Sequence, residues 1–140
     1  MLNKKLVLYS ILSGLLLAFS WPTYGYVFFV FIAFVPLLFI ESTLRNQPVI
    51  KIFSYSFMSF FLWNLISSWW LINSTVFGMA FAIILYSILM SLVFSSFSLV
   101  AKKLNDKLGY IYFVCAWIVF EKFNLNWEFS WPLLLLGNSF

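Results

Sequence analysis

Charged side chains are scarce in this sequence. They make up 9% of the 140 residues, whereas 64% are hydrophobic and 24% are aromatic. Soluble domains carry about 25% charged residues. A water-soluble fold of this length could not bury so much apolar surface, because small domains leave much of their surface exposed. The composition therefore excludes an ordinary soluble domain and indicates that lipid surrounds most of the chain.

Histidine is absent, and Cys115 is the single cysteine. A disulfide within the chain is excluded, and so is a His/Cys metal site, because such sites need several ligands. We therefore expect no metal and no cofactor. The formal net charge is +4, but the basic residues are scattered between hydrophobic runs. A continuous basic face cannot form, so nucleic-acid binding is not expected.

Long apolar runs predict an all-α integral membrane protein. Leu6 to Ile40 carries no charge, and as one helix it would measure about 52 Å, beyond the roughly 30 Å hydrocarbon core. It must therefore reverse, and the Pro/Gly-containing residues 20–25 provide the turn. We predict a single transmembrane domain over residues 1–140, a bundle of about five helices. The spans are about 6–21, 24–40 (kinked at Pro36), 52–69, 77–101 and 109–120, with an incomplete sixth from 132.

The distribution of Lys and Arg predicts a cytoplasmic N-terminus. With that orientation only Lys122 lies on the outer side, and the other seven basic residues lie inside, as the positive-inside rule requires. These seven are Lys4, Lys5, Arg45, Lys51, Lys102, Lys103 and Lys107. One alternative is left open: Lys4-Lys5 before an apolar run, with Ala18-Phe19-Ser20 after it, also loosely fits a cleaved signal peptide.

Tryptophans gather at the outer ends of the predicted spans. This pattern is typical of an aromatic belt at the headgroup boundary. The alternative is an outer surface that also receives a lipid or a membrane-anchored substrate. The residues are Trp21, Trp69, Trp70, Trp127 and Trp131.

Few residues within the spans could carry chemistry. Nearly every charge is assigned to a loop, including Glu41 at the start of a polar break over 41–51. Glu121 is expected to snorkel or to form a hydrogen bond between helices. Cys115 is interpreted as a packing residue, because a thiol in the middle of a span is inert. Lys122 lies about 10 Å away along the same helix, too far to form a hydrogen-bonded pair with it. We therefore predict no catalytic residue. A transporter is also not expected, because the sequence shows no ionisable site within the spans.

Four serines in the fourth span share one helical face, because they repeat at intervals of three and four residues. Small polar residues on one face are typical of a close helix–helix interface. A polar conduit is the alternative. The residues are Ser87, Ser91, Ser95 and Ser98.

Three stretches, in order along the chain, carry recognisable motifs. The first is the turn at residues 17–25, followed by Val-Pro-Leu-Leu at 35–38. The second is Trp70 with Ser74, Phe77 and Gly78. The third is Glu121, then Pro132 eleven residues later, then residues 136–139. Together they resemble apolipoprotein N-acyltransferase, the bacterial enzyme that completes lipoprotein triacylation.

The sequence departs from that family's pattern at three places. The usual Arg-Gly after the glutamate is Asn124-Leu125, Phe-Pro-Trp is replaced at residues 131–133, and Gly-Tyr-Ser-Gln is replaced at residues 137–140. These differences affect expected substrate contacts more than the expected fold.

The resemblance implies the N-terminal transmembrane part of such an enzyme, in the bacterial cytoplasmic membrane. The family transfers an acyl chain from phospholipid to the N-terminal Cys amine of lipoproteins, using a Glu-Lys-Cys triad in a nitrilase-like domain. The expected partners are phospholipid and lipoprotein acyl chains, and a nitrilase-like domain that is separate or missing, since the chain ends before it. Whether the chain is itself an enzyme stays open. The residues implied to face substrate or lipid are Trp70, Ser74, Phe77, Gly78, Glu121 and Pro132.

A second function is consistent with the same sequence. A non-catalytic small membrane subunit, or a lipid-binding scaffold protein, would show the same apolar spans and the same charge distribution.

Overall fold

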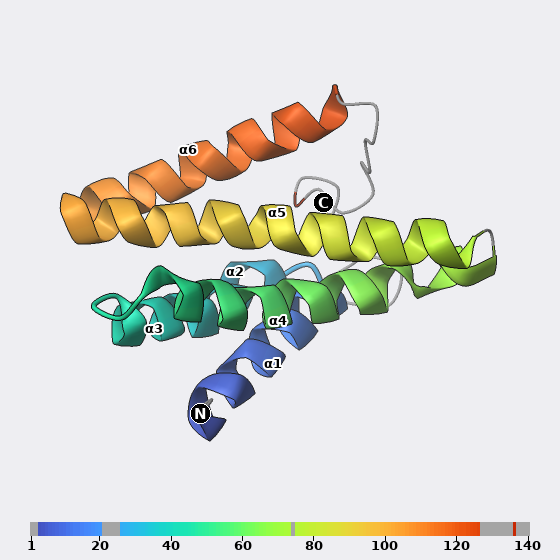
Figure 1. The fold of residues 1–140 in the computed structure, drawn as a ribbon, viewed down its shortest axis with the longest axis horizontal. Helices are drawn as coiled ribbons and strands as arrows, with labels where there is room; N and C mark the ends of the chain where they lie inside the picture. Colours follow the sequence, from blue (N-terminus) through green and yellow to red (C-terminus); the bar gives the residue numbers. More distant parts are fainter. Residues whose placement is uncertain (1–2, 21–25, 74, 127–135, 137–140) are drawn as a thin grey trace.

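The computed structural model describes residues 3–20, 26–73, 75–126 and 136. These residues form helices, and no strand occurs among them, which confirms the predicted all-α class (Figure 1). The elements are α1 (Lys4–Phe19), α2 (Phe29–Ala33), α3 (Val35–Leu44), α4 (Val49–Ser68), the 3-10 helix η1 (Trp69–Asn73), α5 (Val76–Lys103) and α6 (Asp106–Leu125).

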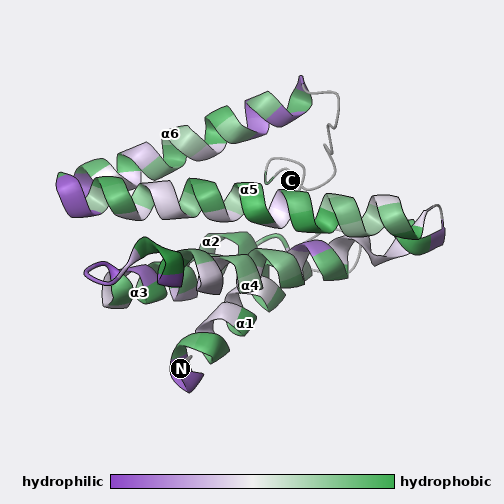
Figure 2. Ribbon diagram, in the orientation of Figure 1, coloured by the Kyte–Doolittle hydropathy of each residue, from purple (hydrophilic) through white to green (hydrophobic). Residues whose placement is uncertain are grey.

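The two long helices α4 and α5 lie side by side at the centre of the bundle. Helix α1 packs on α4, α6 packs on α5, and the short helices α2 and α3 lie against α1 (Figure 1). Apolar residues dominate the helices, and the polar residues gather at helix ends and loops (Figure 2). Large side chains such as Phe28, Phe31 and Val119 are mostly exposed, as expected where lipid replaces water as the solvent.

Among the described residues, three helices are long and apolar enough to cross a membrane: α4 with η1 (Val49–Asn73), α5 and α6. Helix α1 covers most of the first predicted span with 16 residues, and α2 with α3 forms a shorter apolar segment, Phe29–Leu44. The number of membrane crossings and the orientation of the N-terminus stay predictions. The start of the predicted sixth span lies outside the described residues, apart from Leu136.

The second predicted span differs from a single helix over 24–40. It begins at Phe29, breaks at Phe34 and runs on to Leu44. Pro36 lies in the first turn of α3, where its missing N–H costs nothing. The Ala33 carbonyl at the break accepts a 2.6 Å hydrogen bond from the Ser13 hydroxyl of α1. The predicted kink at Pro36 is therefore a break between α2 and α3, and the carbonyl at the break pairs with Ser13 of α1.

Small residues allow α1 and α4 to cross closely. A Cβ atom added at Gly14 would lie 2.7 Å from the backbone oxygen of Ser59. Beside it, the Ser59 hydroxyl donates to the Ser10 carbonyl at 2.8 Å. Glycine and serine thus bring the two backbones into direct contact, as small residues do in membrane helix pairs.

Aromatic rings fill the centre of the bundle. Phe34, at the break before α3, lies edge-on to Trp117 of α6 with ring centroids 5.2 Å apart. Phe60 of α4 lies 5.7 Å from the same indole, and Phe94 of α5 lies 5.7 Å from Phe113 of α6. Such pairs contribute beyond their buried area, so this cluster links α3, α4, α5 and α6.

One end of the bundle collects most of the positive charge. There α4 and α6 begin and α3 and α5 end, at the left of Figure 1, and α1 begins below them, at the bottom of the picture. Arg45 after α3 contacts Asp106 of α6, and the Asn3 amide before α1 donates to the Tyr55 hydroxyl of α4 at 2.9 Å. We call this the basic end. Seven of the eight Lys and Arg residues belong to its helix ends and loops, and Lys122 lies near the opposite end of α6.

Candidate functional site

The residues predicted to face substrate, where the structure describes them, lie toward the end of the bundle opposite the basic end. Trp70 belongs to η1, and Phe77 and Gly78 belong to the first turn of α5. Phe77 is 89% exposed and Trp70 is 46% exposed. Ser74 and Pro132 lie outside the described residues. The large exposed rings leave an apolar surface at this end that the described part of the bundle does not cover.

Gly78 has a local structural role at the start of α5. Thr75 caps the helix, and its side-chain oxygen accepts the Gly78 N–H at 3.4 Å. A Cβ atom at residue 78 would lie 2.6 Å from the Thr75 methyl group. The glycine therefore lets the capping threonine lie close to the first turn, which holds Phe77 at the exposed start of the helix.

Glu121 is a hydrogen-bond acceptor within the bundle. Its Oε1 accepts from the indole N–H of Trp117 at 3.0 Å and from the backbone N–H of Leu136 at 2.8 Å. Glu121 therefore forms hydrogen bonds, but these partners lie on α6 itself and beyond its end, whereas the sequence predicted a bond between helices. The carboxylate orients the central indole and attaches the chain near its C-terminus to α6. Contact between Glu121 and a lipid stays a prediction.

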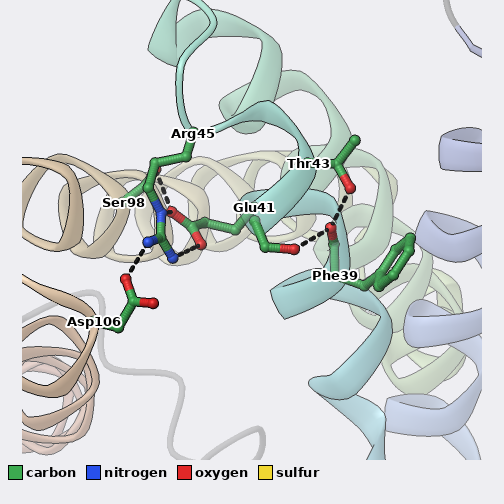
Figure 3. Close-up of polar contacts among 7 residues, drawn as sticks. Phe39, Glu41, Thr43, Arg45, Ser98 and Asp106 are labelled. Atoms are coloured by element: carbon green, nitrogen blue, oxygen red, sulfur yellow. Dashed lines mark hydrogen bonds and ion pairs between the residues drawn. The ribbon is translucent and has the colours of Figure 1, made fainter.

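The sequence interpretation was wrong about Glu41, which it placed in a polar loop. Glu41 lies in α3 and is 1% exposed. Its Oε1 accepts from Arg45 Nε and from the Ser98 hydroxyl, both at 2.9 Å, and its Oε2 accepts from Arg45 Nη2 at 2.8 Å (Figure 3). The helix continues through Leu44 because an i, i+4 ion pair compensates the charge. The i, i+4 spacing of Glu41 and Arg45 in the sequence could have predicted this ion pair.

Arg45 connects this cluster to α6 through a second ion pair, with Asp106 (Figure 3). The hydrogen bonds that Arg45 donates to Glu41 raise the pKa of its guanidinium above the ordinary value, although partial burial opposes this, and Asp106 acts in the same direction as Glu41. The guanidinium therefore stays charged at every working pH. We call Glu41, Arg45, Ser98 and Asp106 the charge cluster.

The serine face of α5 is confirmed as a helix interface. Ser87, Ser91, Ser95 and Ser98 are all buried. Ser87 accepts from the Asn64 amide of α4 at 3.2 Å, and Ser98 donates to Glu41 of α3. The face therefore packs against neighbouring helices.

Cys115 is exposed, so its interpretation as a packing residue was wrong. The packed face of α6 contains Phe113 and Trp117, whose rings are 5.6 Å apart. Cys115 is two residues from each, which places it on the opposite face of the helix. Its neighbours there include Ile111 and Ile118, both more than half exposed. Among the described residues, no group of three or more His, Cys, Asp or Glu could hold a metal ion.

Comparison with known families matches residues 13–140 to the family described as the apolipoprotein N-acyltransferase N-terminal domain. The match covers all but the first 12 residues of the chain. No curated protein and no solved structure matches it. The family-like motifs, the helical fold and the extent of this match agree. The chain therefore belongs to the apolipoprotein N-acyltransferase N-terminal domain family.

Proposed function

We propose that this chain is the transmembrane N-terminal part of an apolipoprotein N-acyltransferase-like protein of the bacterial cytoplasmic membrane. In that role it supports transfer of an acyl chain from phospholipid to the N-terminal Cys amine of lipoproteins. The observation that carries the proposal is the family match over residues 13–140.

The distribution of apolar surface and charge supports this role. Helices α4, α5 and α6 can cross a bilayer, and their outward side chains are largely apolar. With the basic end in the cytoplasm, seven of eight cations satisfy the positive-inside rule. The opposite end then faces outward, where lipoprotein substrates are anchored.

At this outer end, the chain would bind and orient acyl chains. Trp70 and Phe77 offer exposed rings at the α4–α5 connection, and aromatic residues at this depth suit the boundary between acyl chains and headgroups. Glu121 would hold Trp117 and Leu136 in place. In the family, the thiolate that carries the acyl group belongs to a nitrilase-like domain. The role of this chain is therefore positioning.

Reporter fusions test the orientation. Alkaline phosphatase is active only outside the cytoplasm. Green fluorescent protein is fluorescent in the cytoplasm but not when it is exported in the unfolded state. Fusions after Lys51 and after Lys103 should fluoresce and lack phosphatase activity, whereas a fusion after Asn73 should show the reverse. Phosphatase activity after Lys51 and Lys103 would overturn the proposed orientation.

A chimera tests the function itself. This chain would replace the membrane part of a characterised N-acyltransferase, in cells depleted of their own enzyme, and N-acylation of a lipoprotein would be read by mass spectrometry. We expect N-acylation. Trp70→Ala should lower its rate about threefold to tenfold, which is the rate factor that corresponds to the free energy of one aromatic contact. Val119→Ala, at an exposed position in α6, is the matched control and should leave the rate unchanged. A chimera that inserts in the membrane but acylates nothing would contradict the proposal.

A further inference from the structure

A groove lined by both polar and apolar side chains opens at the basic end, between the start of α1, the end of α3 and the first two turns of α4. Its volume is about 690 Å³, which is within the usual range for small-ligand sites. Figure 1 shows the N-terminal half of α1 diverging from α3 and α4 on this side. Asn3 and Tyr55 both line the groove, and the Asn3 backbone amide donates to the Tyr55 hydroxyl at 2.9 Å.

The groove presents hydrogen-bond donors that lack acceptors. Within the described ranges, the Lys51 ammonium makes one hydrogen bond, to Gln47 Oε1 at 3.1 Å, and its two other N–H groups have no acceptor there. The Tyr55 hydroxyl accepts from the Asn3 backbone, and within the described part of the chain it donates to no acceptor. A ligand for these groups must bring several acceptor oxygens.

The charge in the groove is positive and uncompensated. Lys51 is the charged residue that lines it, and no acidic residue lines it within the described ranges. The nearest acidic groups of the basic end, Glu41 and Asp106, are both engaged by Arg45. Lys4 and Lys5 follow Asn3 directly and are exposed, so the surrounding field also favours an anion.

The apolar part of the lining distinguishes a lipid from a free ion. Leu6 and Leu44 also line the groove. Toward the bundle centre from these leucines, the Tyr9 and Phe39 rings pack edge to face between α1 and α3 at 5.1 Å. Phe39 is 52% exposed. The groove thus combines the donors of Lys51 and Tyr55 with apolar side chains, and the same helices α1 and α3 carry apolar rings one to two turns further on, which suits a headgroup attached to acyl chains.

We propose that this groove binds the phosphate headgroup of an anionic phospholipid, with Lys51 and Tyr55 as donors to the phosphate oxygens. The inference rests on the proposed membrane embedding, since it places the groove at headgroup depth in the inner leaflet. The site lies at the end of the bundle opposite Trp70 and Phe77, so the bound lipid is distinct from the acyl donor proposed there.

Native mass spectrometry of the full chain, delipidated in a neutral detergent, tests the site. The probes are phosphatidylglycerol, phosphatidylcholine of the same acyl length, and inorganic phosphate. We expect one phosphatidylglycerol to bind with the highest affinity. Lys51→Met should weaken its binding at least about fivefold. Lys51→Arg keeps the positive charge and should retain most of the affinity. Tyr55→Phe should weaken it by a smaller factor.

Lys103→Met is the matched control, because Lys103 is an exposed lysine of the same end that does not line the groove. It should change the affinity less than twofold. Equal losses in Lys51→Met and Lys103→Met would show diffuse surface charge and overturn the site. Displacement of the lipid by millimolar inorganic phosphate, or equal binding of phosphatidylcholine, would overturn the assigned ligand.

The reporter fusions separate this inference from the proposed function. If the fusions place the basic end in the cytoplasm and the wild-type chain binds no phosphatidylglycerol selectively, the lipid site alone fails. If the fusions place that end outside, the proposed orientation fails, whatever the binding result.

Discussion

Glu41 on α3 and Ser98 on α5, 57 residues apart in the sequence, are joined by a buried 2.9 Å hydrogen bond. The same Glu41 oxygen accepts from Arg45, and Arg45 contacts Asp106 of α6. A buried carboxylate is costly in an apolar bundle unless it is paired and hydrogen-bonded. The charge cluster meets that condition, and it connects α3, α5 and α6 at the basic end.

Arg45→Ala should destabilise the bundle strongly. It leaves the Glu41 carboxylate, which is 1% exposed, without a cation, and removing one partner of a buried ion pair costs about 3–5 kcal/mol. The measurement is the free energy of unfolding in detergent micelles, followed by circular dichroism during titration with a denaturing detergent.

Asp106→Asn is the matched control for that substitution. The Asp106 side chain is 63% exposed, and solvent-exposed ion pairs contribute about 0–1 kcal/mol. If Asp106→Asn lowered the free energy of unfolding as much as Arg45→Ala, the Arg45–Asp106 pair, and not the buried Arg45–Glu41 pair, would be the important link.

Gly14→Ala should weaken the α1–α4 contact. The added methyl group would lie 2.7 Å from the Ser59 backbone oxygen, which cannot rotate away as a side chain could. Overpacking of this kind costs about 1–3 kcal/mol. The same unfolding titration measures it. Leu8→Phe enlarges a side chain of α1 that is 63% exposed and should leave the midpoint unchanged; a wild-type midpoint in Gly14→Ala would refute the close crossing.

Glu121→Ala should release the backbone amide of Leu136. That amide donates to Glu121 Oε1 at 2.8 Å, and hydrogen bonds to charged groups contribute about 1.5–3 kcal/mol. Hydrogen exchange at Leu136, followed by mass spectrometry, should therefore accelerate about tenfold or more. Glu121→Gln keeps the acceptor oxygen and should retain most of the protection. Unchanged exchange in Glu121→Ala would show that the carboxylate does not hold this segment.

Hydrophobic runs predicted the helices well where charged or polar residues bound them. Residues 77–101 and 109–120 lie inside α5 and α6, because Lys102 to Lys107 interrupts the run between them. The same logic failed at Glu41. A carboxylate read along the chain looks like the end of a span, whereas its compensating partners are one helical turn away at Arg45 and on another helix at Ser98.

The rotation of each helix about its axis could be predicted only where the sequence marks one face. The spaced serines marked the packed face of α5. Helix α6 offers no such mark: Phe113, Cys115 and Trp117 are all suited to a core, and the aromatic rings of α4 and α5 decide which of them are buried. The exposure of Phe77 likewise depends on what packs around the start of α5, which its motif does not encode.

Cys115 offers a direct test of lipid exposure, because it is the single thiol in the chain. It is exposed on α6 beside apolar side chains, so in a membrane it should face acyl chains. Maleimides react with the thiolate, which forms in water and not in hydrocarbon. A charged, water-soluble maleimide should therefore label Cys115 very slowly in intact membranes and fully after unfolding in dodecyl sulfate. The comparison is Lys103→Cys in a Cys115→Ser background, which places a thiol at an exposed position of the basic end and should react rapidly in opened membrane vesicles. Equal labelling rates at the two positions would mean that water reaches the outer face of α6, and lipid could not then be its solvent.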